Sequence, residues 1–387
     1  MSVPKRGFTR AEFEQRTLRA QKLMREHSLD ALLLTTEPNV RYFSGFFSQF
    51  WQSPTRPWFL LVPMEGKPVA VIPEIGQSGM AATWIEDIRT WPAPRPEDDG
   101  ISLLASVIRE RQRFGRIGVT LGHESCLRMP VADFQKLGEL LAQTEIVDCT
   151  SLVRSLRNIK SDEEIEKIRY ICGLASDGFE ALPGLLRTGD TERENCRRFR
   201  IDLLSRGVDD SPYLISGSGP DGYDSIIMGP SDRQLHDGDV MIIDTGSTFD
   251  GYFCDFDRNF AFGRASGKVC EAYRTVYAAT EAGLTAAKPG ATMADVWRAM
   301  WTVLEAGGAL GNDVGRMGHG LGIQLTEGPS VTPADQTVLQ PGMVVTLEPG
   351  MTFAPGKQMV HEENLLITES GAELLSRRAA AEIPVID

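Results

Sequence analysis

Long apolar runs are missing from this 387-residue sequence, and so is any excess of basic residues. No run is long enough for a membrane-spanning helix and the N-terminus is polar, so we expect neither a signal segment nor a membrane protein. Forty lysine and arginine residues stand against 53 aspartate and glutamate residues, which gives a formal net charge of −13. Nucleic-acid binding requires a dense basic surface, so this charge argues against it.

Cysteine is also scarce. The six cysteines contain no Cys-x-x-Cys pair and are too few to serve as a disulfide framework for a chain of this length. We therefore expect reduced, mostly buried thiols in a cytoplasmic protein. With 42% hydrophobic and 24% charged residues, the chain is long enough for two globular domains.

Alternating helical and strand patterns predict a small α/β domain at the N-terminus. Helices are expected at 9–26, 101–112 and 131–142, and short strands at 29–35, 59–63, 68–72, 117–120 and 145–147. Ser161 and Glu164 form a capping-box pattern that begins the first helix of a larger second domain. Two further helices are expected at about 267–287 and 293–306. We place the domains at 1–153 and 154–387.

An aromatic loop, residues 46–58, lies between two of the predicted strands and contains two prolines. It is either a surface loop folded over its own core or a contact to a partner or ligand. In the second case Arg56 offers a forked donor for a carboxylate, and Trp58 adds an aromatic face.

The second domain is organised around residues 240–255. An apolar run that ends at Asp244, a turn-forming Asp250-Gly251 pair and a second run that carries Asp255 predict a β-hairpin with a carboxylate on each arm. Burying an unpaired carboxylate costs several kcal/mol or more. The two acids therefore either face water or share a cation.

Three later segments carry groups that can join these acids. His319 lies between glycines, Glu348 ends an apolar strand, and Glu362 begins another. Oxygen-rich ligation with one imidazole suits Mn, Co, Fe(II) or Zn, and the sequence does not select one of them.

The order and surroundings of these five groups resemble the creatinase, aminopeptidase P, prolidase and methionine aminopeptidase family, the pita-bread metallohydrolases. The matching segments, each with its ligand, are 244–255, Gly-His-Gly-Leu-Gly at 318–322, Leu-Glu-Pro-Gly at 347–350 and 362–368. Residues 39–46 and 156–161 are similar to the family's N-terminal domain and to the start of its catalytic domain. The resemblance implies an α+β pita-bread domain preceded by a smaller creatinase-type α/β domain.

What the resemblance implies is a site with two divalent metal ions that hydrolyses a C–N bond in a small proline-like, betaine-like or amidine substrate. Asp255 and Glu362 would bridge the metals, Asp244 would complete one, and His319 with Glu348 the other. Glu348 and Glu327 are the implied catalytic groups, and Tyr252 and Thr326 the implied substrate contacts. Creatinase works without metal, so the fold alone does not establish metal dependence.

Two histidines of the peptidase members have no counterpart here. Thr326 stands in place of one, just before Glu327, and a residue at or near Ile227 stands in place of the other. In the peptidases these imidazoles hydrogen-bond the substrate carbonyl and the developing oxyanion, so their absence argues against ordinary Xaa-Pro cleavage.

Asp257 is an additional acid, because the family has threonine at this position. Strand periodicity places it on the same face as Asp255. It is either an ion-pair partner for a nearby arginine or an additional carboxylate in the metal shell, acting as general base or binding a cationic substrate.

The resemblance also implies a homodimer in which the 51–58 loop of one subunit, with Arg56, covers the neighbour's site. Two alternatives stay open. One is a lyase like the dimethylsulfoniopropionate lyases, which Asp257 and the missing histidines favour. The other is a non-catalytic binding protein like the proliferation-associated relatives, which the five filled ligand positions disfavour.

Overall fold

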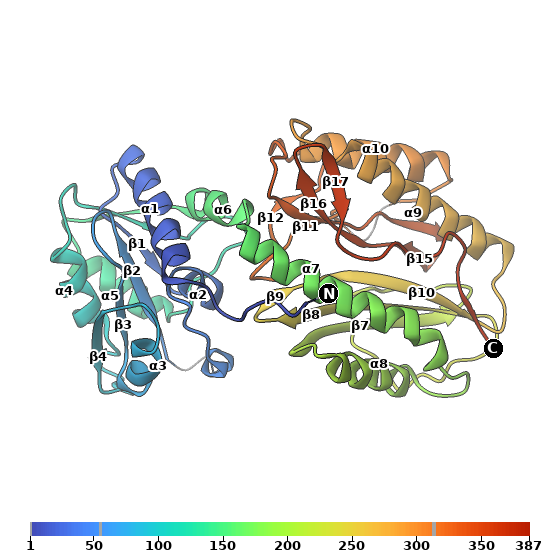
Figure 1. The fold of residues 1–387 in the computed structure, drawn as a ribbon, viewed down its shortest axis with the longest axis horizontal. Coiled ribbons are helices and arrows are strands. Elements are labelled where there is room, and N and C mark those ends of the chain that lie inside the picture. The colour runs from blue at the N-terminus through green and yellow to red at the C-terminus, as the bar shows by residue number, and fades with distance from the viewer. Residues whose placement is uncertain (1, 54–55, 312–314) are drawn as a thin grey trace. The chain divides into compact units, whose positions relative to one another are not determined.

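The computed structural model describes residues 2–53, 56–311 and 315–387. The chain divides into two compact units, residues 5–157 and residues 158–387 with the N-terminal residues up to Pro4 (Figure 1). The domain boundary predicted between 153 and 154 falls within helix α6, Thr150–Asn158. Among the described residues, no helix has the length and apolar character needed to cross a bilayer.

The unit of residues 5–157 is a mixed sheet flanked by helices. Its strand order is β4-β3-β2-β1-β5-β6, with β2 antiparallel to both of its neighbours and the remaining pairs parallel. The strands are β1 (Ala31–Leu34), β2 (Phe59–Pro63), β3 (Val69–Pro73), β4 (Asp87–Trp91), β5 (Arg116–Val119) and β6 (Glu145–Asp148). The helices are α1 (Arg10–Glu26), α2 (Glu37–Ser44), α3 (Gln77–Ala81), α4 (Ile101–Arg109), α5 (Val131–Leu140) and α6.

Apolar side chains explain why this unit folds as it does. Thr9 caps α1 by accepting a hydrogen bond from the Glu12 backbone N–H. The apolar stripe of α4, which includes Leu104 and Ile108, is fully buried against strand residues such as Leu33 and Val71. The predicted α/β domain is confirmed, and α2, α3, α6 and β4 are additions to it.

The unit of residues 158–387 contains two five-stranded sheets. The first has the order β18-β10-β8-β7, with β9 paired to β8, and the second has the order β12-β11-β13-β16-β17. The first sheet is built from β7 (Asp210–Pro220), β8 (Asp239–Phe249), β9 (Tyr252–Phe253), β10 (Phe256–Phe262) and β18 (Val385–Ile386). The second contains β11 (His319–Gly320), β12 (Glu327–Ser330), β13 (Val344–Leu347), β16 (Glu363–Thr368) and β17 (Gly371–Leu374), and β14 (Gly350–Ala354) pairs with β15 (Lys357–Val360).

Long helices pack around these sheets (Figure 1). They are α7 (Asp162–Ala181) and α8 (Glu192–Arg206), which pack on β7 and β8, and α9 (Gly267–Ala286) and α10 (Met293–Ala306), of which α9 packs on β13–β15. The predicted capping box of Ser161 and Glu164 begins α7. Val240 and Ile242 of β8 join Leu365 of β16 in one buried core. Even-numbered positions of β8 thus face this core, and Asp244 is the next of them.

Candidate metal centre

The β8–β10 hairpin brings three carboxylates to one face of the first sheet. Asp250 and Gly251 form its turn with φ values of 45° and 63°, and positive φ at both positions is typical of the type I′ turn. Asp244 lies directly opposite Asp257 in the register of β8 and β10, and Asp255 precedes Asp257 by two positions. The three side chains therefore leave the backbone on the same side.

Side chains of helix α7 contact the turn of this hairpin. The ammonium of Lys167 lies 2.9 Å from a carboxylate oxygen of Asp250, and Lys167 is buried. Tyr252, a predicted substrate contact, is fully buried, and its hydroxyl donates a hydrogen bond to Glu164 at 2.9 Å. These contacts fix the end of the hairpin that leads into Asp255.

His319 lies on β11, a two-residue strand pressed between β12 and β13. A Cβ atom on Gly318 would collide with the Thr346 carbonyl, and one on Gly320 with the Gly328 carbonyl, which explains the glycines on each side of the histidine. His319 Nδ1 lies 2.9 Å from the Gly320 carbonyl oxygen. A carbonyl only accepts, so Nδ1 carries the proton and Nε2 has its lone pair available for a metal.

The imidazole meets two of the acids. Nε2 of His319 lies 3.4 Å from Oδ2 of Asp255, and ligating atoms of Asp255, His319 and Glu362 all lie within 4.8 Å of one another. All three residues are buried. The structure thus brings together one residue from the hairpin, one from β11 and one that directly precedes β16.

Burial and the neighbouring carboxylates also shift the pKa values of Asp244 and Glu348. Burial, then Asp255 and Glu348, raises the pKa of Asp244 well above its usual value, and burial raises the pKa of Asp255 in the same direction. Burial, then Asp255 and the other carboxylates, raises the pKa of Glu362. Burial raises the pKa of Glu348 to about 7, against the opposing effect of His319. Without a cation, these carboxyl groups favour their protonated forms.

Three carboxylate oxygens of this cluster have no hydrogen-bond partner among the described residues: Oδ1 of Asp244, Oδ1 of Asp255 and Oε1 of Glu362. Buried polar atoms are seldom left unsatisfied, and each one costs about 1–3 kcal/mol. Carboxylate oxygens together with an imidazole nitrogen are suitable ligands for divalent metal ions. The residues present therefore fit the metal that the sequence predicts.

Asp257 is almost completely buried beside this cluster. Among the described residues it forms no ion pair, and the only hydrogen bond to its carboxylate comes from Asn259 Nδ2 at 3.4 Å. The predicted ion pair with a nearby arginine is not formed, because Arg258 directs its guanidinium to the Glu363 carboxylate and to backbone carbonyls. Burial, followed by the charge of Asp244, raises the pKa of Asp257.

Glu327, a predicted catalytic residue, lies in a buried ion pair. One of its oxygens is 3.5 Å from Lys160 Nζ, and the other accepts a hydrogen bond from the Gln324 backbone N–H at 3.1 Å. Thr326, which precedes it, is half-buried. At the position of the other missing histidine, Ile227 is 76% exposed in the segment beside β7.

The aromatic loop belongs to the other unit. Arg128 donates hydrogen bonds to the Arg56 and Trp51 carbonyls at 2.6 and 3.2 Å. Trp58 is buried and stacks on Phe46 with ring centroids 5.3 Å apart. The described part of the loop is thus packed on its own unit, and the predicted substrate contacts of Arg56 and Trp58 remain predictions.

Tyr213 is a residue that the sequence reasoning missed. It lies on β7 opposite Gly246 of β8, and it is half-buried. Burial, followed by the charges of Asp244, Asp255 and the two glutamates of the cluster, raises the pKa of its hydroxyl, which favours the protonated phenol. β7 is rich in Ser, Gly and Pro, so its sequence gave no strand signal that would have placed this tyrosine.

The unit of residues 158–387 thus contains a buried cluster of carboxylates and one imidazole, to which both of its five-stranded sheets contribute. Residues 166–369 match metallopeptidase family M24, and residues 16–159 match the creatinase/prolidase N-terminal domain. The chain belongs to metallopeptidase family M24. The fold expected from the resemblance is therefore confirmed in both parts.

The relatives are peptidases of similar length. The chain is 28% identical over 371 residues to a Mycobacterium tuberculosis protein named "Probable dipeptidase PepE", with 95% of each chain covered. It is 28% identical to an uncharacterized peptidase of Staphylococcus saprophyticus, with 91% of this chain and 96% of the relative covered. The crystal structure of dipeptidase PepE from Mycobacterium ulcerans matches with a TM-score of 0.86, 27% identity and coverage of 98% and 99%.

Proposed function

We propose that this protein is a dinuclear metallohydrolase that cleaves a C–N bond in a small, dipeptide-like or otherwise specialised substrate. The observation that carries the proposal is the group of carboxylate oxygens without protein partners beside His319. Membership of family M24 and the similarity to a crystallised dipeptidase support it. The donor set suits Mn, Co, Fe or Zn.

In this proposal Asp255 and Glu362 would be shared by two divalent ions, Asp244 would help to hold one of them, and His319 with Glu348 would help to hold the other. When bound, two such ions acidify a shared water and polarise the scissile carbonyl. Glu348 would accept the proton that the attacking water loses and return it to the leaving nitrogen.

Tyr213 takes over part of the role of the missing imidazoles. The raised pKa of its hydroxyl favours the protonated form, so it can donate a hydrogen bond to the developing oxyanion. Thr326 offers a second hydroxyl at the position of one absent histidine. The phenol and the threonine hydroxyl are neutral donors. We therefore propose that the oxyanion formed from the substrate needs less stabilisation than the oxyanion of an ordinary peptide bond, or that the substrate has a different reacting group.

The test is metal analysis of the purified protein, followed by a screen of the metal-loaded protein. The panel contains Xaa-Pro and other dipeptides, creatine-like and cyclic amidines, and sulfonium or betaine compounds. We expect hydrolysis of one class, with water consumed and one amine released, and its loss in Asp255→Ala. Metal-loaded protein that hydrolyses nothing in the panel would contradict the proposal.

A lyase is the second candidate, and the buried Asp257 favours it because a carboxylate there can remove a substrate proton. Product analysis separates the two reactions. A lyase yields an alkene without incorporating oxygen from labelled water, whereas a hydrolase incorporates that oxygen into its product.

We further propose a cytoplasmic homodimer in which the loop containing Arg56 and Trp58 covers the partner's site and holds a substrate carboxylate. All six cysteines are free thiols, four of them buried, which suits a reducing compartment.

A further inference from the structure

The two carboxylates proposed to bridge the metals come from different sheets. Asp255 directly precedes β10 of the first sheet, and Glu362 directly precedes β16 of the second. In the described part of the chain, β10 and β16 are not paired with each other by backbone hydrogen bonds. Other contacts must therefore set the distance between the two segments, residues 255–257 and 362–364.

Asn364 makes the first of these contacts. Its Oδ1 accepts a hydrogen bond from the Asp255 backbone N–H at 2.9 Å, and its Nδ2 donates to the Asp255 backbone carbonyl. The thiol of Cys172 also donates to Oδ1 at 3.3 Å, and Asn364 is completely buried. One amide of the second sheet thus holds both backbone polar groups of a ligand in the first.

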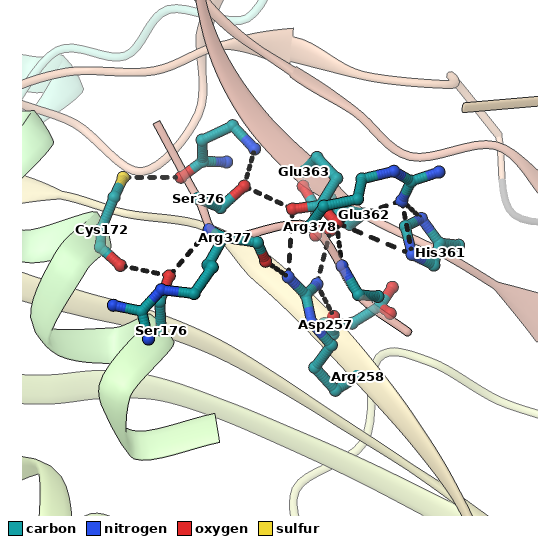
Figure 2. A network of polar contacts seen from close by, with 12 residues as sticks. Cys172, Ser176, Asp257, Arg258, His361, Glu362, Glu363, Ser376, Arg377 and Arg378 are labelled. Carbon is teal, nitrogen blue, oxygen red and sulfur yellow. Dashed lines mark hydrogen bonds and ion pairs between the residues drawn. The ribbon is translucent and has the colours of Figure 1, made fainter. Parts of the chain in front are cut away.

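Arg258 makes the second contact, in the opposite direction. One guanidinium nitrogen donates to the Asp257 carbonyl at 2.5 Å and to the Glu362 carbonyl at 3.0 Å. The other nitrogen donates to the Glu363 carboxylate at 3.0 Å and to the Arg377 carbonyl. Figure 2 shows Arg258 directed into this network, with Glu363 between Arg258 and Arg378. The arginine of the first sheet thus holds the backbone of a ligand in the second.

We propose that Asn364 and Arg258 are positioning residues that hold Asp255 and Glu362 at the separation required for two metal ions to bind together. This inference rests on the proposed two-metal site. Because metal ligands must be held to within a fraction of an ångström, freeing either segment should weaken the binding of the second ion more than that of the first.

The test compares Asn364→Ala with Asn195→Ala. Asn195 is a matched control, because it is also completely buried and binds both backbone groups of one residue, Arg187, at 2.9 and 3.3 Å. Both variants lose the same kind of hydrogen bonds, so both should lower the melting temperature. Only Asn364 touches a predicted metal ligand.

The measurement is titration with Mn²⁺ by calorimetry, with electron paramagnetic resonance to detect spin coupling between two bound ions. We expect Asn364→Ala to weaken the second binding step at least tenfold and to lose the coupled signal, and Asn195→Ala to stay within twofold of the native protein. Native affinity and coupling in Asn364→Ala would overturn the inference. A native protein that never binds two ions would instead overturn the proposed function.

Arg258→Lys provides a second route if Asn364→Ala does not fold. Lysine keeps the positive charge beside Glu363 but cannot span two carbonyls as a guanidinium does. Its control is Arg16→Lys, a buried arginine of the other unit that donates to the Tyr42 carbonyl at 2.9 Å. The inference requires loss of the coupled signal in Arg258→Lys alone, and its retention there would refute it.

Discussion

The hydroxyl of Tyr213 is the hydrogen-bond donor that we propose in place of the two missing peptidase histidines. Replacing Tyr213 with Phe removes only that oxygen and leaves the ring in place. We expect kcat to fall about 10²-fold, as when one oxyanion donor is lost, with the metal content unchanged. Steady-state kinetics and metal analysis of Tyr213→Phe test this, and an unchanged kcat would show that the phenol does not act on the substrate.

The acids of the metal centre make the stability of the protein depend on both pH and metal. Burial raises the pKa of Asp244, Asp255 and Glu362 in the metal-free protein, and repulsion by neighbouring carboxylates adds to this for Asp244 and Glu362. A carboxyl group whose pKa is raised by folding stabilises the fold below its ordinary pKa of about 4, and this contribution is lost as the pH rises through the raised value.

A divalent ion replaces the missing protons, so Mn²⁺ should raise the melting temperature more at about pH 8 than at about pH 6. Free ion at 100 times the dissociation constant contributes about 2.7 kcal/mol. Calorimetry with and without a chelator measures both effects. Equal shifts at the two pH values would contradict this account of the carboxyl groups.

A substitution at Asp257 should affect both the stability of the metal-free protein and turnover. Asn at this position keeps the volume but removes a negative charge directly opposite Asp244. We expect Asp257→Asn to stabilise the metal-free protein by about 1 kcal/mol or more at alkaline pH and to lower turnover about 10²-fold. Asp237→Asn, at an exposed acid, is the control. Turnover that survives in Asp257→Asn would leave the acid without a catalytic role.

At the scale of elements, the two-residue strand β11 leaves no space for larger side chains beside His319. A Cβ atom on Gly320 would collide with the Gly328 carbonyl, so Gly320→Ala must displace β11 or β12. We expect a loss of about 1–3 kcal/mol and weaker metal binding, since His319 is the preceding residue. Gly138→Ala is the control, because no atom lies within 4 Å of the added methyl group on α5. Denaturant unfolding and metal titration of both variants check this.

Elements with strong local signals were predictable, whereas those defined by distant contacts were not. The Asp250-Gly251 turn and the Ser161 capping box act through their own backbone, so the sequence alone identified both. Strand periodicity also placed Asp257 on the same face as Asp255, but the pairing of Asp257 with Asp244 was not predicted. By contrast, β7 with Tyr213 is a strand because it pairs with β8. The hydrogen bonds between Asn364 and Asp255 join residues 109 positions apart.

At the scale of the whole molecule, the proposed dimer makes a distinct prediction. Arg56→Ala removes the loop cation, and Asp255→Ala disables the metal centre. If the loop acts on the partner subunit, a mixture of the two inactive variants, dissociated and reassembled, regains part of the activity, since each mixed dimer contains one complete site.

Size-exclusion chromatography of the mixture confirms reassembly, and each variant treated alone is the control. A mixture that stays inactive, although mixed dimers form, would place the loop over the site of its own subunit. Full activity of Arg56→Ala alone would instead show that Arg56 has no role in catalysis.

The division of the proposed metal ligands between two sheets also has a consequence for synthesis in the cell. Asp244 is translated 118 residues before Glu362, since 362 − 244 = 118, and the unit of residues 5–157 precedes both. Domains fold as they emerge from the ribosome, N-terminal first. The nascent chain can thus fold its first unit while the ligand set is still incomplete. The hairpin packs against residues of β16, so the metal centre forms only after that last ligand segment has been translated.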